Sequence, residues 1–188
     1  MNPLVRFVQA HRPQLSQEDL ALIADSFYLV KKQKGEHLLT QDKTCQYLYF
    51  LIEGITRSYS IRNGHDITTW FGFKDEFITS FTSFFPGHPS YESIEMLSDG
   101  QLYQISRQEF TQLQNDHPLV ESIVHHFTLA YTLQLERRLF QIQTHSAAEK
   151  YQAILEQEPR LIQQIPNKHL ASYLGITRET LSRIRSKR

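Results

Sequence analysis

One long segment in the second half of the chain carries apolar residues on every side of a helix. Between Pro118 and Gln141 there is no glycine and no further proline, so the segment predicts one uninterrupted helix. Its apolar positions are Leu119, Val120, Ile123, Val124, Phe127, Leu129, Ala130, Tyr131, Leu133, Leu135, Leu139 and Phe140. A helix that is apolar all round must be buried all round, so this one needs partners on more than one face.

A second copy of the same helix is the simplest partner for the face that the rest of the chain leaves open. We therefore expect a two-fold homodimer. The predicted dimer interface consists of Val120, Ile123, Val124, Phe127, Tyr131 and Leu135. The alternative is a central helix wrapped by one compact monomer, but the segments on either side of it are short for that purpose.

The C-terminal segment, residues 164–188, predicts two short helices joined by a tight turn. Asn167 can cap the first helix, Gly175 can adopt the positive φ that ends it, and Thr177 can cap the second. The apolar residues of this segment recur at spacings that bring them together between the two helices. They are Leu170, Ala171, Leu174, Ile176, Leu181 and Ile184.

Polar and basic side chains remain for the outward side of the second short helix. Arginine can donate two hydrogen bonds to guanine, glutamate can accept one from cytosine, and a helix fits the major groove of DNA. The residues predicted to contact DNA are Lys168, Thr177, Arg178, Glu179, Ser182, Arg183, Arg185 and Lys187. The alternative is a solvated basic helix of an ordinary helical hairpin.

The distribution of charge favours the nucleic-acid interpretation, although the formal net charge of the whole chain is zero. Residues 1–136 contain 10 Lys and Arg against 16 Asp and Glu, whereas residues 137–188 contain 10 against 4. A basic C-terminal module suits a polyanionic partner such as double-stranded DNA.

Short runs of Tyr, Phe, Ile, Leu and Thr fill residues 28–106 and predict strands. Asn63-Gly64 gives the strongest hairpin signal, because both residues accept the positive φ values of a type I′ turn. Helices are expected over 3–27, where Ser16 with Asp19 resembles a start signal, and over 107–116. Ser146 with Glu149 forms a capping box that opens another helix. The predicted fold class is α+β, with an N-terminal β-barrel or jelly roll, flanking helices, and a C-terminal helix-turn-helix module.

Catalytic, metal and cofactor sites are not expected. Cys45 is the single cysteine, so no disulfide can form within the chain, and a cytoplasmic location is the simplest expectation. The N-terminus lacks the pattern of a signal peptide, and no apolar stretch is long enough to span a membrane. His125 and His126 are adjacent on a helix and cannot chelate one ion together, which leaves a haem ligand among these histidines or Cys45 as the alternative.

The order of parts resembles the Crp/Fnr family of bacterial transcription regulators. Lys34-Gly35-Glu36 followed by residues 47–54 is similar to the opening strands of that family's cyclic nucleotide-binding-like domain, and Arg178-Glu179-Thr180 with Arg183 is similar to its reading helix. The resemblance implies an effector domain over 1–117, a dimerisation helix over 118–141 and a DNA-binding domain over 142–188. It also implies that Arg178, Glu179 and Arg183 contact bases, and that RNA polymerase is a partner.

The nucleotide-binding cassette departs from this family. Cyclic-nucleotide receptors use a Gly-Glu pair and a later Arg-Ser pair to hold ribose and phosphate, but Thr79-Ser80 and Ser90-Tyr91 stand in those places. No Lys or Arg occurs from Asp75 to Gln104, and burying a phosphate without a cation is costly. We therefore expect no cyclic AMP binding. The degenerate pocket is assigned to Phe77, Thr79, Ser80, Phe81, Ser90 and Tyr91.

Two functions remain for comparison. The first is a homodimeric, sequence-specific DNA-binding transcription regulator, and the second is a small-molecule sensor that signals mainly through a protein partner. The aromatic residues around the cassette are either core or the wall of an apolar pocket for an uncharged or cationic effector. An enzyme is not expected, because no catalytic motif is present.

Overall fold

A computed structural model gives the fold of residues 2–186. The chain divides into two compact units. The first comprises Met1–Ser60 with Thr69–His125, and the second comprises Ile61–Thr68 with His126–Arg188. Each unit is described in turn.

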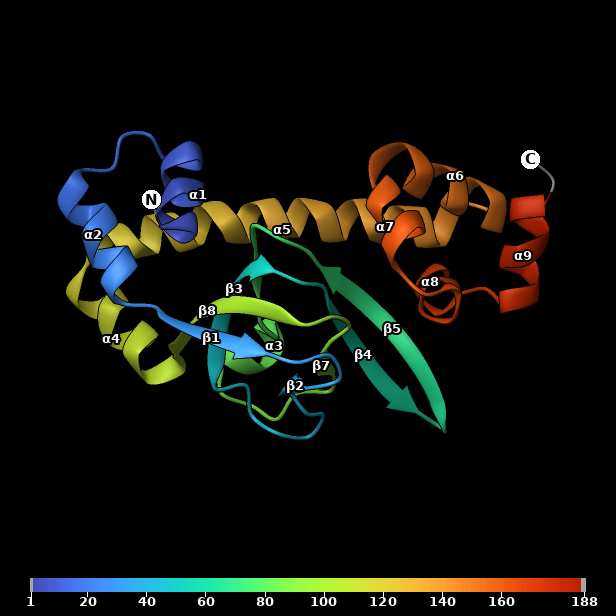
Figure 1. Ribbon diagram of the computed structural model, residues 1–188, viewed down its shortest axis with the longest axis horizontal. Coiled ribbons are helices and arrows are strands. Elements are labelled where there is room, and N and C mark those ends of the chain that lie inside the picture. Colours follow the sequence, from blue (N-terminus) through green and yellow to red (C-terminus); the bar gives the residue numbers. More distant parts are fainter. Residues whose placement is uncertain (1, 187–188) are drawn as a thin grey trace. The chain divides into compact units, whose positions relative to one another are not determined.

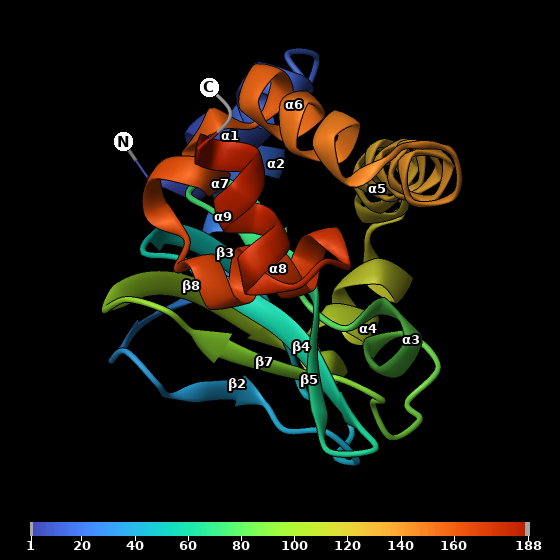
Figure 2. The same cartoon turned by 90° about the vertical axis from the view of Figure 1, so that its right-hand side faces the viewer.

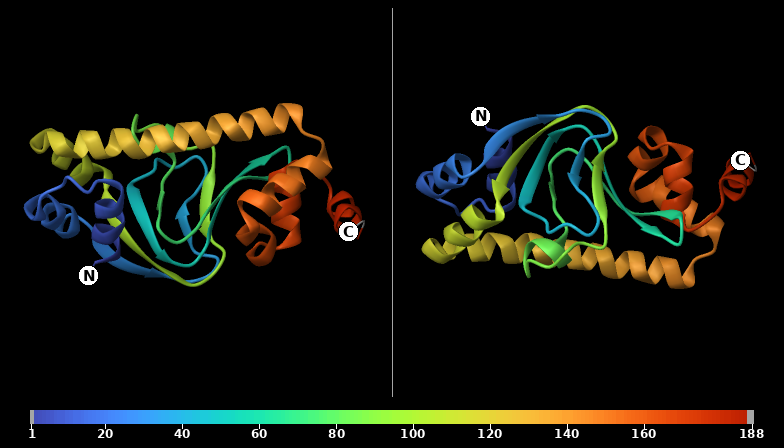
Figure 3. Two further views of the ribbon diagram at one scale, coloured as in Figure 1. Left: turned by 90° about the horizontal axis from the view of Figure 1, so that it is seen from above. Right: turned by 90° about the horizontal axis from the view of Figure 1, so that it is seen from below.

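The first unit is built on two four-stranded antiparallel sheets (Figures 1 and 3), of which only the hairpin tip, residues 61–68, is grouped with the second unit. One sheet has the order β1-β8-β3-β6 and the other β2-β7-β4-β5. The strands are β1 (Tyr28–Lys32), β2 (His37–Leu39), β3 (Tyr47–Glu53), β4 (Thr56–Arg62), β5 (His65–Gly72), β6 (Glu76–Ile78), β7 (Ser93–Met96) and β8 (Gly100–Ser106). This arrangement matches the predicted jelly roll.

The hydrophobic core of this unit draws on both sheets. Leu51 of β3 and Leu102 and Ile105 of β8 are fully buried, and Ile94 and Met96 of β7 are 1% exposed. Each such side chain contributes about 1.5–3 kcal/mol through its removal from water. The jelly roll is therefore held mainly by contacts between its own two sheets.

Glycine is required at two positions for different reasons. Asn63 and Gly64 have φ of 50° and 76°, so the turn between β4 and β5 is the predicted type I′ turn. At Gly100 the backbone passes so close to β3 that an added Cβ would lie 2.3 Å from the carbonyl oxygen of Glu53. Only a residue without a side chain fits at Gly100.

Four helices accompany the sheets: α1 (Pro3–His11), α2 (Gln17–Asp25), α3 (Phe81–Phe84) and α4 (Arg107–Asp116). The helical segment predicted over 3–27 consists of two helices, because the chain turns at Pro13 and a new helix starts after Ser16, where the start signal was predicted. Ser16 forms the expected capping box with Asp19. Helix α4 has the predicted bounds, 107–116.

Helix α5 (Pro118–Thr144) is long and uninterrupted (Figure 3), and its residues from His126 onwards belong to the second unit. The shorter helices of that unit are α6 (Ala147–Gln157), α7 (Pro159–Gln164), α8 (Asn167–Leu174) and α9 (Arg178–Ser186), which gather in one cluster (Figure 2). Ser146 and Glu149 form the expected capping box at the start of α6. Between residues 2 and 186, no helix combines the length and the apolar content that crossing a membrane requires.

Replacing Leu102 by alanine tests the core. Leu102 is 0% exposed, and Leu29 on the neighbouring strand β1 is 53% exposed. We expect Leu102→Ala to lower the free energy of unfolding by about 2–5 kcal/mol, because it removes buried apolar contacts and leaves a cavity. The same change at Leu29 should cost less than about 1 kcal/mol, because that side chain is largely in water. Chemical denaturation measures both, and equal losses would contradict the assigned core.

Candidate nucleic-acid interface

Helices α8 and α9 are held together by a compact apolar contact. Leu170, Ala171 and Leu174 of α8 are at most 5% exposed, and Leu181 of α9 is 1% exposed. These are four of the six residues that the spacing predicted, and the remaining two, Ile176 and Ile184, are half-buried. The apolar side of α9 is thus used in packing.

The turn between α8 and α9 has the predicted chemistry. Gly175 adopts φ 68° and ψ 33°, the left-handed conformation that glycine tolerates best. The amide of Ile176 donates to the carbonyl oxygen of Ala171 at 3.0 Å, which closes the end of α8. Thr177 then caps α9, since its Oγ1 accepts from the amide of Thr180 at 3.2 Å.

Asn167 differs from its predicted role. It is the first residue of α8, the preceding Pro166 occupies the cap position, and no side-chain cap bond is made there. Instead, Asn167 Oδ1 accepts from Arg185 Nη1 at 2.6 Å. The Asn167 side-chain oxygen thus accepts from a guanidinium of α9. As a cap it would have accepted from a backbone amide of α8.

The outward side of α9 carries most of the residues predicted to contact DNA. Thr177, Arg178, Glu179, Ser182 and Arg183 are exposed, as is Lys168 in the first turn of α8. Arg185 is half-buried, and Lys187 lies outside the described residues. The pKa of the Glu179 carboxyl is held below its ordinary value, first by a hydrogen bond from its own backbone and then by one from Thr177. Glu179 therefore presents a carboxylate at neutral pH.

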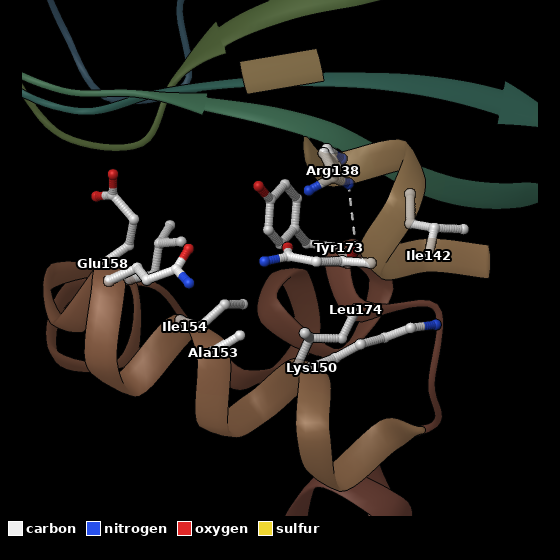
Figure 4. Close-up of a pocket in the computed structure, with 11 residues that line it drawn as sticks. Arg138, Ile142, Lys150, Ala153, Ile154, Glu158, Tyr173 and Leu174 are labelled. Carbon is white, nitrogen blue, oxygen red and sulfur yellow. Dashed lines mark hydrogen bonds between the residues drawn. The ribbon is translucent and has the colours of Figure 1, made fainter. Parts of the chain in front are cut away.

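A small cavity in the second unit lies among α5, α6, α7 and α8 (Figure 4). The guanidinium of Arg138 stacks 3.5 Å from the ring centre of Tyr173 and donates to the Tyr173 carbonyl oxygen at 3.2 Å. Desolvation of this buried guanidinium lowers the pKa of Arg138. The cavity holds about 80 Å³, whereas ligand pockets usually hold roughly 300–1,000 Å³. It is too small for a nucleotide.

The predicted dimer residues on α5 are mostly covered by their own chain. Val120 and Ile123 are 5% and 8% exposed, and Val124 packs against the core of the first unit. Phe127 and Tyr131 are half-buried, and Leu135 is 40% exposed. Other large apolar side chains on α5 are more exposed. They are Leu129 (51%), Leu133 (53%), Leu139 (55%), Phe140 (60%) and Ile142 (51%).

Two of the residues assigned to the cassette meet inside the first unit. Ser80 and Ser90 are 0% and 2% exposed, and their hydroxyl oxygens are 3.1 Å apart. Glu92, which the sequence did not single out for this site, lies beside them. Its carboxylate accepts from Thr69 Oγ1 at 3.1 Å and is hydrogen-bonded to Ser80.

The other four predicted cassette residues make different contacts. Phe77 packs on Phe50, with ring centres 5.2 Å apart, in a cluster that includes Phe7 of α1. The remaining three residues face separate surroundings: Thr79 Oγ1 donates to the Tyr47 carbonyl oxygen, Phe81 packs on Phe85, and Tyr91 is 48% exposed.

Cys45 is 1% exposed and belongs to the hydrophobic core of the first unit. Its Sγ lies 3.4 Å from both the Tyr47 carbonyl oxygen and Thr79 Oγ1. The thiol is therefore enclosed by the core, as expected for a packing residue.

Two arginines from outside residues 75–104 form hydrogen bonds with residues of that segment. Arg107 Nε donates to the carbonyl oxygen of Phe84 at 2.6 Å, which satisfies the C-terminal end of α3. Arg57 is 3% exposed, and its Nε donates to Glu95 Oε1 at 2.8 Å. Neither contact could be read from the cassette's own residues, because each joins residues that are far apart in the sequence.

Comparison with known proteins defines the class of fold. Residues 25–117 match the model described as "Cyclic nucleotide-binding domain". None of the curated protein sequences matches the chain. The match begins just before β1 and ends before α5, so it covers both sheets of the first unit.

Solved structures extend the likeness into the second unit. FixK2 from Bradyrhizobium japonicum is similar at 20% identity and a TM-score of 0.72, over 86% of this chain and 83% of that one. A protein assigned to the Crp/Fnr family of transcriptional regulators, from Eubacterium rectale, is 19% identical with a TM-score of 0.72, over 94% and 84%. The catabolite activator protein of Thermus thermophilus is 21% identical with a TM-score of 0.59, over 99% and 86%. The chain has the fold of Crp/Fnr-type transcription regulators.

The buried Glu92 predicts an unusual pH dependence of stability. Burial raises the pKa of its carboxyl above the ordinary value of 4.5, against the opposing hydrogen bonds from Ser80 and Thr69. A raised folded-state pKa means that the folded chain binds the proton more tightly than the unfolded chain. The contribution of the Glu92 carboxyl to the free energy of unfolding is therefore fully present below pH 4.5, and it is lost as the pH rises through the folded-state pKa.

We expect Glu92→Gln to remove this decline and to raise the free energy of unfolding at neutral pH, as measured by chemical denaturation at several pH values. Glu36→Gln is the control, and it should lower the free energy of unfolding at neutral pH. Hydrogen bonds from Gln33 and Lys32 lower the pKa of Glu36, so its ionised form favours the folded state. A Glu92→Gln protein with the pH profile of the wild type would show that this carboxyl is not buried.

Proposed function

We propose that this chain is a sequence-specific DNA-binding transcription regulator of the Crp/Fnr type that acts as a homodimer. The observation that carries the proposal is the division of α9 into two sides. Leu181 is buried against α8, while Arg178, Glu179 and Arg183 are exposed on the other side. A helix that is fixed by its apolar side and displays two arginines and a carboxylate fits the major groove.

The proposed contacts follow from the chemistry of these side chains. Arg178 and Arg183 each donate to a guanine edge, and Glu179 accepts from a cytosine amino group. Ser182 and Thr177 approach the sugar-phosphate backbone, and Lys168 neutralises a phosphate near the first turn of α8. The exposed positions of all six support this assignment. Helices α8 and α9 would then form the helix-turn-helix, with α9 as the reading helix.

Dimerisation is proposed through the exposed apolar side of α5. Leu129, Leu133 and Phe140 are 51–60% exposed and are four and seven residues apart, so they form one stripe along the helix. Isolated apolar residues at a surface are ordinary, but a stripe of large ones marks a contact surface. A second copy of α5 would cover it with the same residues. Two reading helices could then enter successive major grooves roughly 34 Å apart.

The effector domain is proposed not to bind cyclic nucleotide. Glu92 brings a carboxylate to the hydroxyl groups of Ser80 and Thr69, so a second anion beside it would be repelled. Arg57 and Arg107 already donate to Glu95 and to the Phe84 carbonyl oxygen. RNA polymerase is the protein partner that the resemblance suggests. A sensor that acts mainly through another protein remains the competing proposal, and selection of DNA sites separates the two.

Selection of sites from a pool of random duplexes tests DNA recognition. The wild type should enrich a pseudo-palindromic site, whereas a sensor acting through a protein partner should show salt-sensitive binding without a consensus. Against the enriched duplex, Arg178→Ala and Arg183→Ala should each lose about 1–3 kcal/mol of binding free energy and relax specificity, because each removes a base contact.

Lys168→Ala is the matched control for these two variants. It should weaken binding to the enriched and random duplexes alike, because a phosphate contact carries no sequence information. Cyclic AMP should leave the affinity of the wild type unchanged. Equal losses on both duplexes for all three variants would contradict the assigned roles.

Leu133→Glu tests the proposed dimer. A glutamate in the middle of the α5 stripe would bury a carboxylate in the interface, so we expect the variant to be monomeric at micromolar concentration. Light scattering should give the 22.1 kDa of one chain for Leu133→Glu and about twice that mass for the wild type. Leu29→Glu is the control, because Leu29 on β1 is equally exposed at 53%. A monomeric wild type would refute the proposed homodimer.

A further inference from the structure

Arg185 stands apart from the other basic residues of α9. Arg178 and Arg183 are exposed, whereas Arg185 in the last turn is half-buried and turns back towards the other helices of the second unit. Its Nη1 donates to Asn167 Oδ1 at 2.6 Å, and its Nη2 donates to the carbonyl oxygen of Ile162 at 3.5 Å. The sequence pattern grouped Arg185 with the DNA-contacting residues, but these bonds direct its guanidinium inward.

One guanidinium therefore connects the end of α9 to three other helices. Asn167 begins α8 and Ile162 belongs to α7. The guanidinium carbon also lies 5.9 Å from the ring centre of Tyr151, a residue of α6 that is 6% exposed. Arg185 Nε is buried and has no hydrogen-bond partner among the described residues, so water is excluded from that side of the group. A positive charge at the C-terminal turn also interacts favourably with the helix dipole.

The rest of α9 is anchored nearer its other end. Thr177 caps the first turn, and Leu181 is the residue of α9 that is fully packed against the neighbouring helices. A short helix held near its start and middle can still tilt at its far end. Leu181 attaches the middle of α9 to its neighbours, and Arg185 attaches its last turn. Two separate attachments along its length fix the direction of the helix axis.

We propose that Arg185 is a positioning residue that fixes the direction of α9, and that it does not contact DNA. The inference rests on the proposed function of α9 as a reading helix, and it deepens that proposal by separating the residue that aims the helix from those that contact DNA. Arginine is required because its planar fork places two donors on two separate acceptors. A lysine keeps the charge but carries all its donors on one atom.

The test compares Arg185→Lys, Arg185→Met and Asn167→Ala. The probes are the palindromic duplex that the wild type enriches and a random duplex of the same length. We expect Arg185→Lys and Asn167→Ala to lose on the order of tenfold in affinity for the enriched duplex, because each removes a hydrogen bond of a charged group. The salt dependence of binding should keep its wild-type slope in all three variants, because no phosphate contact is lost.

A second measurement needs no DNA. Hydrogen exchange at the amides of the last turn of α9 should be faster in Arg185→Lys and Asn167→Ala than in the wild type, because the attachment is lost. Asn167→Asp keeps an acceptor for Arg185 and should retain wild-type protection. Arg183→Lys, which changes an exposed arginine of the same helix, is the control and should leave exchange unaltered.

The outcomes separate the two proposals. If Arg185→Lys keeps wild-type exchange and affinity while Arg185→Met lowers the salt slope by about one, Arg185 contacts a phosphate and the inference is overturned. If the wild type enriches no site, the proposed function fails, and the exchange rates still decide whether Arg185 holds α9. Unchanged exchange in both Arg185→Lys and Asn167→Ala would overturn the positioning role by itself.

Discussion

The contact between α8 and α9 is the interaction on which the proposed recognition surface depends. Leu170, Ala171, Leu174 and Leu181 exclude water between the two helices, and Gly175 allows the sharp turn that brings the helices together. Because α9 uses its apolar side in this contact, Arg178, Glu179 and Arg183 lie on its exposed side. The polarity of α9 and the exposure of its charges are consequences of the same packing.

The first unit combines a fold associated with ligand binding and a cassette occupied by the chain's own polar groups. Its two sheets match a cyclic nucleotide-binding domain. Ser80 and Ser90 approach each other, and Glu92 and Thr69 complete a hydrogen-bonded cluster. Arg57 and Arg107 bond to Glu95 and to the carbonyl oxygen of Phe84. In this jelly roll, Ser80, Ser90, Thr69 and Glu92 hydrogen-bond with one another.

Local chemistry in the sequence was sufficient to predict the elements that depend on neighbouring residues. The capping boxes at Ser16 and Ser146, the turn at Asn63-Gly64 and the turn at Gly175 all involve residues within a few positions of one another. Contacts between distant residues could not be predicted in this way. Arg185 and Asn167 are 18 positions apart, and Arg107 and Phe84 are 23 apart. The apolar circumference of α5 likewise did not reveal that Val120 and Ile123 face the chain's own core.

The enclosed thiol has a practical consequence for studying this protein. Cys45 is the single cysteine of the chain, and only 1% of it is accessible to solvent. A thiol-specific reagent can therefore reach the sulfur only when the surrounding strands separate, so the modification rate follows the opening of the jelly roll. The rate of modification of Cys45 can therefore report local opening of the folded jelly roll without an engineered cysteine.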